Sequence, residues 1–279
     1  MKQAASVVFL VVASSVWLHA QDRSSLPSFE VASIKDSERP MAAPSGPGRF
    51  SRPYTTVAQL LIFAHQIAEF QIEGGPDWVR TRHFEVQARA EGTPSADQMR
   101  LMVQRLLAER FKLDVHTETR DMARYALVMA RSDKRLGPRL RPSAFDCPAL
   151  IKARGPDYKP ETGPPQPGDP PRCGLSARVG GGSMTIMVEG QPMSSFAKTL
   201  QPLAGRIVID KTGLTGTYDI ELETEMLSVP GIPADAFGKP GEGLSLSTVL
   251  PEQLGLKLEP ERGPVEILVI DSVELPTPN

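Results

Sequence analysis

One strand pattern occurs twice in this chain, and it constrains the fold more than any other feature. Thr217–Glu223 alternates apolar residues with acids, the period of two that is typical of a half-buried strand. His83–Arg89 has the same order of residue types, with an aromatic, an acid, a β-branched residue, an apolar residue and a charge at matching places. Two strands with the same residue pattern, one in each half of the chain, indicate an internal repeat.

A second match follows the first in the same order. Leu107–Val115 aligns with Leu250–Leu258, and leucine, glutamate and leucine recur at the same offsets. We therefore predict an α+β fold with an internal duplication of a β-α-β-α-β-β unit, in which helices pack on one face of small antiparallel or mixed sheets. Chance remains the alternative, because any two helix-to-strand junctions share apolar spacing.

Local signals place the elements of each half. Ser95 and Gln98 form a capping-box pattern before the clearest helical stripe, and Thr55 or Thr56 can cap an earlier helix. Residues 37–53 hold four prolines and two glycines and are expected to form a loop. We expect two antiparallel strand pairs, formed by Leu113–Thr117 with Tyr125–Ala130 and by Leu256–Glu259 with Val265–Ile270.

A proline- and glycine-rich segment divides the chain. Ten prolines and eight glycines fall between Gly137 and Gly182, too many for regular structure. The expected organisation is a signal peptide over residues 1–20, a first α+β repeat over 21–136, a connecting segment over 137–183 and a second repeat over 184–279.

The N-terminus predicts export. Lys2 precedes an uncharged, mostly apolar run, Ala4–Leu18, and cleavage is expected near Ala20. The alternative is a membrane anchor, but the run is short for a bilayer span. The chain is therefore expected to be secreted or periplasmic, with no membrane span after cleavage.

Cys147 and Cys173 are the only cysteines, and an oxidising compartment favours a disulfide between them. Two free buried thiols, or half of a metal site, are the alternatives. A metal site needs more soft ligands, and no histidine or third cysteine lies between the two.

Charge and motifs exclude several function classes. A formal net charge of -2 gives no electrostatic case for nucleic acid or an anionic membrane. Neither a serine-hydrolase elbow nor a phosphate loop occurs, so we expect no catalytic residues, no bound metal and no cofactor.

A few side chains are candidates for a functional surface. His83 with Glu85, and His116 with Glu118, each place two metal-capable groups on one face of a strand, although a solvated strand face is the commoner explanation. Trp78 follows a Gly-Gly-Pro-Asp loop and is either a ligand-facing or a packing aromatic.

Several segments together resemble a known family, the soil-associated exported proteins of acidobacteria, a family of unknown function (DUF3738-like). The segments that carry the resemblance are FEVASIK, QIEGGPDWVRTRHFEVQARA, LLAERFKLDVHTETRDMARYALVMAR, DKTGLTGTYDIELE and EQLGLKLEPERGPVEILVIDSVELP. The resemblance spans Phe29 to Pro276 and implies no established enzyme activity and no assigned catalytic residues. Related domains fused to membrane metallopeptidases of the antibiotic-sensor type imply an extracytoplasmic sensing or binding role.

These observations favour a non-enzymatic extracytoplasmic binding or sensing module for an unknown envelope ligand or protein. The repeated scaffold would offer a cleft between its halves. Two alternatives stay open: an envelope hydrolase with a sequence-dispersed carboxylate and histidine site, and a structural surface protein whose exposed edge strands assemble.

Overall fold

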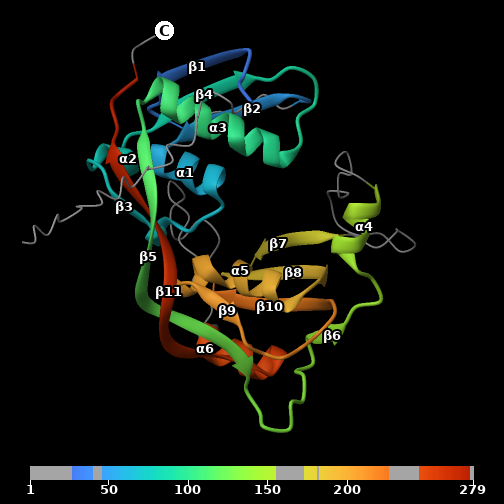
Figure 1. Ribbon diagram of the computed structural model, residues 1–279. Coiled ribbons are helices and arrows are strands. Elements are labelled where there is room, and N and C mark those ends of the chain that lie inside the picture. Colours follow the sequence, from blue (N-terminus) through green and yellow to red (C-terminus); the bar gives the residue numbers. More distant parts are fainter. Residues whose placement is uncertain (1–26, 40–45, 155–172, 181, 226–244, 277–279) are drawn as a thin grey trace, which may run out of the picture.

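A computed structural model describes residues 27–39, 46–154, 173–180, 182–225 and 245–276. The fold is mixed α+β, as the sequence predicts. In the described part, six α-helices accompany three small sheets, which form an upper lobe, a lower lobe and a long ribbon that runs along both (Figure 1).

The upper lobe contains an antiparallel sheet of three strands in the order β1-β4-β2. The strands are β1 (Val31–Asp36), β2 (Arg49–Thr55) and β4 (Phe84–Arg89). The expectation of a loop over residues 37–53 is wrong at its end, because β2 pairs with the free edge of β4 and buries Phe50. Pro53 is tolerated there because it lies on an edge strand where the register shifts.

Helices cover one face of this sheet. They are α1 (Val57–His65), α2 (Trp78–Thr81) and α3 (Ala96–Arg110), with a short 3₁₀ turn, η2 (Glu69–Gln71). The expected caps are confirmed, since Thr56 and Ser95 each complete a capping box with a glutamine three residues later. The first hydrophobic core packs α1 and α3 against the buried side chains of the sheet.

The lower lobe contains a sheet of four strands in the order β6-β10-β8-β7. The strands are β6 (Leu140–Pro142), β7 (Gly174–Gly180), β8 (Ser183–Gln191) and β10 (Tyr218–Glu225). The second core packs this sheet against α5 (Met193–Ala204), α6 (Leu246–Val249) and a π-type turn, η3 (Leu250–Leu254).

The proline- and glycine-rich segment is more regular than its composition indicates. It contributes β6, β7 and α4 (Cys147–Arg154), so the expectation that it lacks regular structure is wrong over these residues. The edges of β10 and β8 supply hydrogen-bond partners that the segment itself does not have. Cys147 and Cys173 form a disulfide, with their Cα atoms 5.3 Å apart, which ties α4 to the start of β7.

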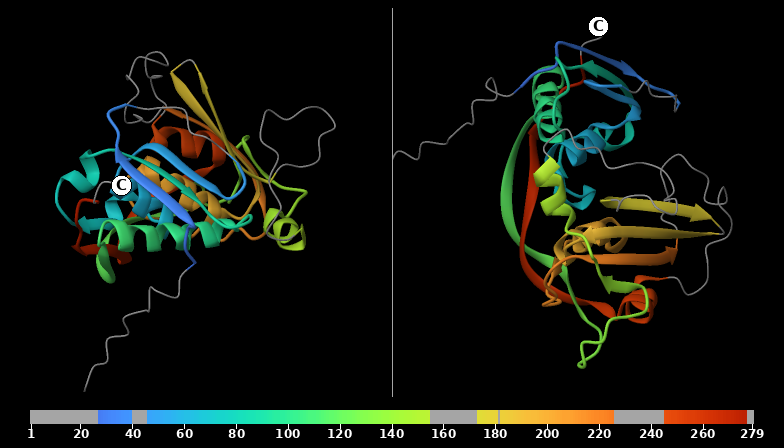
Figure 2. Two further views of the ribbon diagram at one scale, coloured as in Figure 1. Left: turned by 90° about the horizontal axis from the view of Figure 1, so that it is seen from above. Right: turned by 90° about the vertical axis from the view of Figure 1, so that its right-hand side faces the viewer.

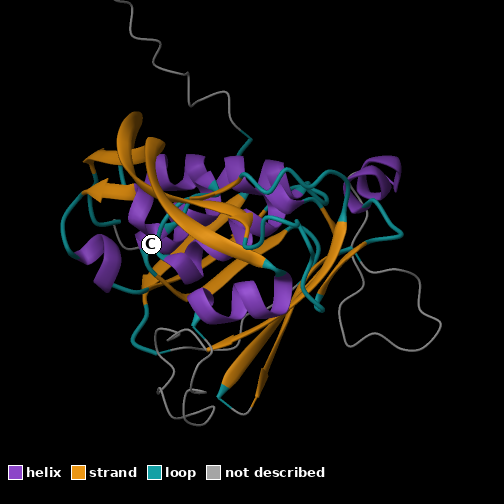
Figure 3. Ribbon diagram, turned by 90° about the horizontal axis from the view of Figure 1, so that it is seen from below, coloured by secondary structure: helices purple, strands orange, loops and turns teal. Residues whose placement is uncertain are grey.

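Four strands form the long ribbon, in the order β3-β11-β5-β9. They are β3 (Ile72–Gly74), β5 (Asp114–Met129), β9 (Val208–Asp210) and β11 (Leu256–Ser272). The view from below shows the two long strands as a curved ribbon crossing the molecule (Figure 3).

The two expected strand pairs are wrong. Leu113–Thr117 and Tyr125–Ala130 do not pair with each other but belong to one strand, β5, and the two C-terminal segments form one strand, β11. The residues between Thr117 and Tyr125 include neither glycine nor proline, so nothing turns the chain there. Instead β5 and β11 pair with each other over almost their full lengths.

Each lobe is completed by a long strand from the other half of the chain. Leu268 and Ile270 of β11 lie in the first core, whereas Leu127 of β5 lies in the second. The right view of Figure 2 shows the two lobes bridged by the ribbon. Among the described residues, no helix is long and apolar enough to cross a membrane.

Candidate functional site

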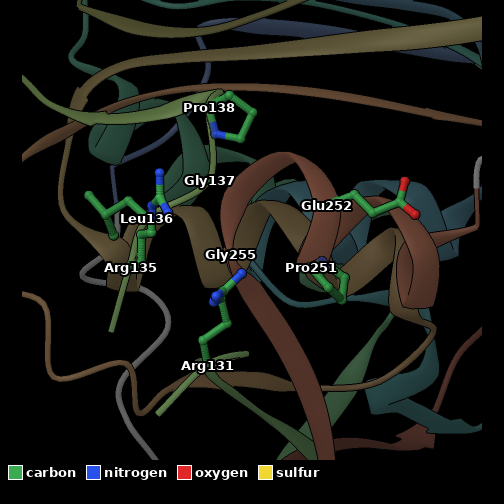
Figure 4. Close-up of a pocket in the computed structure, with 8 residues that line it drawn as sticks. All are labelled: Arg131, Arg135, Leu136, Gly137, Pro138, Pro251, Glu252 and Gly255. Carbon is green, nitrogen blue, oxygen red and sulfur yellow. The ribbon is translucent and has the colours of Figure 1, made fainter. Parts of the chain in front are cut away.

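A pocket lies where the turn that follows β5 meets the π-type turn η3. Its volume is about 300 Å³, at the lower end of small-molecule sites. Figure 4 shows the residues that line it: Arg131, Arg135, Leu136, Gly137, Pro138, Pro251, Glu252 and Gly255.

Backbone hydrogen bonds fix the two walls of this pocket to each other. The Gly137 N–H donates to the carbonyl of Leu254 at 2.9 Å, and the Arg139 N–H donates to that of Gln253 at 2.9 Å. A Cβ atom on Gly137 would lie 2.3 Å from the Gln253 carbonyl oxygen, so this approach requires glycine. The walls are therefore rigid, and a π-type turn of this kind is frequent at functional sites.

Two guanidinium groups stand at one side of the pocket. Nε of Arg131 lies 3.4 Å from a carboxylate oxygen of Asp133, and both side chains are exposed. The backbone N–H of Arg135 chiefly lowers the pKa of Asp133, and Arg131 lowers it further. Within the described part of the chain, no acid pairs with the Arg135 guanidinium. The carboxylate of Glu252 points away from both arginines (Figure 4).

Sequence reasoning missed this pocket. Its lining comes from two segments more than a hundred residues apart, and periodicity cannot show that they meet. One signal was present, since residues 131–141 carry five basic side chains and one acid around a Gly-Pro pair.

The structure brings His116 and Glu118 together on the exposed face of β5, with a third group that was not foreseen. His116 Nε2 lies 3.0 Å from Glu118, and Nδ1 lies 2.9 Å from Asp271 of β11. The hydrogen bond with Asp271, and then that with Glu118, raises the pKa of His116. A ring held between two carboxylates on both nitrogens is stabilised as a cation and is poorly suited to act as a general base.

The same network continues to a third strand. Arg120 contacts Glu118 and also Glu73, which lies on β3. The hydrogen bond from His116, followed by that from Arg120, lowers the pKa of Glu118. These side chains are about 40% exposed, so the network is a polar surface that ties three strands together.

Glu85 lies on β4, in a different sheet from His116 and Glu118, and His83 immediately precedes β4. The His83 ring stacks on Tyr54 with 3.8 Å between ring centres, and Glu85 accepts a hydrogen bond from Gln87. No contact joins the two histidine–glutamate pairs in the described residues. In that same part of the chain, no group of three or more histidine, cysteine, aspartate or glutamate side chains is placed to hold a metal ion.

Trp78 opens α2 and packs at the edge of the first core. Its ring meets Phe84 edge-on, with 6.5 Å between centres. Of the candidates that the sequence offered, Trp78 and His83 thus make aromatic contacts within the upper lobe.

Comparisons with known proteins identify the family. No curated protein and no solved structure matches the chain. A family model described as a protein of unknown function, DUF3738, matches residues 58–273, which span the β5–β11 ribbon and the pocket. The chain therefore belongs to the DUF3738 family.

Proposed function

We propose that this protein is a non-enzymatic extracytoplasmic binding module whose ligand site is the pocket between the β5 turn and η3. The observation that carries this proposal is a rigid hollow of about 300 Å³ with two guanidinium groups on one wall. Its walls are fixed by backbone hydrogen bonds before any ligand arrives, which lowers the entropic cost of binding.

The expected signal peptide supports the extracytoplasmic part of the proposal. The apolar N-terminal run ahead of Ala20 has the features of a cleaved signal, although residues 1–26 lie outside the described part of the chain. The Cys147–Cys173 disulfide agrees with this, since disulfides persist mainly in oxidising compartments.

A panel of small envelope molecules, both charged and neutral, tests the binding role. At least one should raise the melting temperature of residues 21–279 in a saturable way, because a ligand that binds only the folded state stabilises it. The effect should vanish in Pro138→Trp, which fills the pocket, and persist in Pro142→Trp, whose exposed proline lies outside it. A panel without any saturable stabiliser would contradict the proposal.

The hydrolase alternative finds less support. Envelope hydrolases that use carboxyl pairs need one acid with a raised pKa. Among the described carboxyl groups with a shifted pKa, all are lowered, chiefly by a hydrogen bond from a cation or a backbone N–H: Asp36, Glu118, Asp133 and Glu261.

One observation favours the third hypothesis, a surface protein that assembles through its edge strands. β7 is the edge of the lower sheet, and Leu175 and Val179 on it are 61% and 43% exposed. The β7–β8 hairpin, in yellow, projects from the body in the left view of Figure 2. A strand without proline or acid, and with exposed apolar residues, can pair with another chain.

The glycine and apolar positions of β7 are symmetric about Ala177, which favours a second copy of this chain as its partner. About Ala177, an antiparallel pair would place Leu175 opposite Val179, Ser176 opposite Arg178 and glycine opposite glycine. Apolar residues would meet apolar ones, and no like charges would face each other. Such a two-fold contact would join two sheets edge to edge.

The oligomeric state of the mature chain tests this second candidate. Light scattering across a hundredfold range of concentration should show a dimer that Leu175→Lys abolishes, since a lysine blocks edge pairing. Lys198→Ala on α5 serves as the control. A monomer at every concentration, or a dimer indifferent to Leu175→Lys, would refute pairing through β7.

We further propose that the two halves arose by duplication, with repeats over residues 21–136 and 184–279 around the connecting segment 137–183. The strand connections support this origin. β3 of the first half pairs in parallel with β11, and β9 of the second half pairs in parallel with β5. The last strand of each half thus pairs with a three-residue strand of the other half.

The register of the ribbon gives further support. The spacing between Leu107 and Leu250 in the aligned repeat equals that between Asp121 and Pro264, and those two residues face each other in the β5–β11 pairing. Tyr125 and Leu268, separated by the same spacing, pair with Val208 and Ile72. A two-fold axis through the Asp121–Pro264 pair would exchange β5 with β11. It would place Asp121 opposite Pro264 and would give Tyr125 and Leu268 equivalent pairing partners.

A further inference from the structure

From the chemistry of the pocket we infer that its ligand carries a small oxyanion, a carboxylate or a phosphate, which Arg131 and Arg135 bind together. This inference rests on the proposed binding function and adds the ligand class. A guanidinium group has a planar fork of N–H donors that matches two oxygens of such an anion.

The placement of the two arginines supports an anion in particular. Both line the pocket, at opposite ends of one short turn. Asp133, between them in sequence, is already engaged by the Arg135 backbone N–H at 3.1 Å and by Arg131 at 3.4 Å. Its single charge does not balance two guanidinium groups, so the turn keeps a net positive charge toward the pocket.

Two of the other bases of this segment pair with acids outside the pocket. Arg139 pairs with Glu221 and Glu223, and Arg141 pairs with Asp219. Lys134 is exposed and is not part of the pocket lining, so Arg131 and Arg135 are the bases of residues 131–141 that face a ligand there. The opposite wall is formed by Pro251 and Gly255, and it adds no acid aimed at the arginines because the Glu252 carboxylate points outward (Figure 4).

The backbone that carries these two exposed arginines is anchored to the opposite wall of the pocket. The turn is held by the Ala130 N–H donating to the Gly255 carbonyl at 2.8 Å and by the Gly137 N–H donating to that of Leu254. Arg131 and Arg135 therefore project from fixed backbone positions. An anchored backbone loses less conformational freedom on binding than a free loop would.

Titration with inorganic phosphate, and separately with succinate, tests this inference on residues 21–279 at constant ionic strength. Both calorimetry and the amide NMR shifts of residues 131–138 and 251–255 would be recorded. We expect saturable binding by at least one anion, weakened about tenfold or more in Arg135→Gln and in Arg131→Gln, since each removes a charge-assisted hydrogen bond. Arg135→Lys should retain part of the affinity, because it keeps the charge and loses the fork.

Arg141→Gln is the matched control, since it removes a base of the same segment that lies outside the pocket. It should bind as the unaltered chain does. Equal losses in Arg141→Gln and Arg135→Gln would overturn the inference, because the anion would then respond only to overall charge. Unchanged NMR shifts with both anions would also overturn it.

The two proposals fail in distinguishable ways. Suppose that a neutral panel member binds the unaltered chain but not Pro138→Trp, while phosphate and succinate do not bind. In that case the ligand class is wrong and the binding function stands. If nothing charged or neutral binds, both are wrong. Melting temperatures without ligand confirm that each variant is folded, which the exposure of both arginines leads us to expect.

Discussion

Glu118 and Glu261 each lie between two cations, one on each long strand of the ribbon. Glu118 contacts His116 and Arg120, and Glu261 contacts Lys211 and Arg124 at 2.5 and 2.8 Å. The pKa of Glu261 is lowered, first by Lys211 and then by Arg124, as that of Glu118 is lowered by His116 and Arg120. The pairs of Glu118 are exposed, and single exposed pairs contribute little, whereas the side chains of Arg124 and Glu261 are only 15% and 22% exposed.

Stability should depend on pH through His116. Because its pKa is raised in the folded state, its contribution is fully present below the ordinary value of 6.5 and is lost as pH rises through the folded value. Glu118 has the opposite sign, so its contribution is present above 4.5 and is lost in acid. The network should stabilise most between these two limits.

Urea unfolding at pH 5.5 and pH 8.5 measures this effect. The free-energy gap between the unaltered chain and His116→Gln should be larger at pH 5.5 than at pH 8.5. His83→Gln is the control, since His83 stacks on Tyr54 instead of bonding to a carboxylate. A gap that is independent of pH would contradict the assigned role of His116.

At the scale of elements, the long strands are shared between the two cores. β5 is encoded in the first half, but its Leu127 is fully buried in the second core. β11 is encoded in the second half, but its Leu268 is buried in the first. Neither core can be completed by residues from its own half alone.

Leucine truncation should reveal this exchange. Leu268→Ala and Leu127→Ala should each cost about 2–5 kcal/mol, because each leaves a cavity in a packed core. After signal cleavage Trp78 is the only tryptophan, and it packs in the first core, so its fluorescence reports on that core. Leu268→Ala should lower the urea midpoint of the Trp78 signal more than Leu127→Ala does.

The exposed Val31→Ala is the control for these truncations and should change the midpoint little. If Leu127→Ala destabilises the Trp78 signal as much as Leu268→Ala, then the two lobes unfold as one cooperative unit and the separate-core description is wrong.

At the scale of the whole molecule, the ribbon joins two lobes around the pairing of Asp121 with Pro264. Helix α3 leads directly into β5, and the turn η3 leads directly into β11. In each half, the long strand therefore follows a helical element of that half. If the halves descend from one copied unit, the first half should retain a surface that accepts a copy of itself.

The fragment over residues 27–136 tests that origin. Expressed alone, it should form a two-fold dimer through β5, with the last strand of each copy completing the other. Light scattering measures its mass, and Ala123→Pro, which removes an N–H from the middle of β5, should reduce dimer formation. A folded monomer would argue against the duplicated origin.

The features that the sequence predicted correctly are those set by residues close together in the chain. The caps at Thr56 and Ser95 and the apolar stripes of α1 and α3 are short-range features, so the sequence determines where these helices begin. The alternation over Tyr218–Glu225 likewise identifies a half-buried strand, and the two cysteines lie close enough in the chain for their pairing to be expected.

Only the tertiary structure decided the rest. β2, β6 and β7 form because edges of other strands accept them, and the proline and glycine content of their own segments argues against them. β5 and β11 are continuous because each supplies hydrogen bonds to the other over more than a hundred residues of sequence separation. The pocket exists because that long-range pairing brings Arg131 and Arg135 beside Pro251 and Gly255, a meeting that no local pattern encodes.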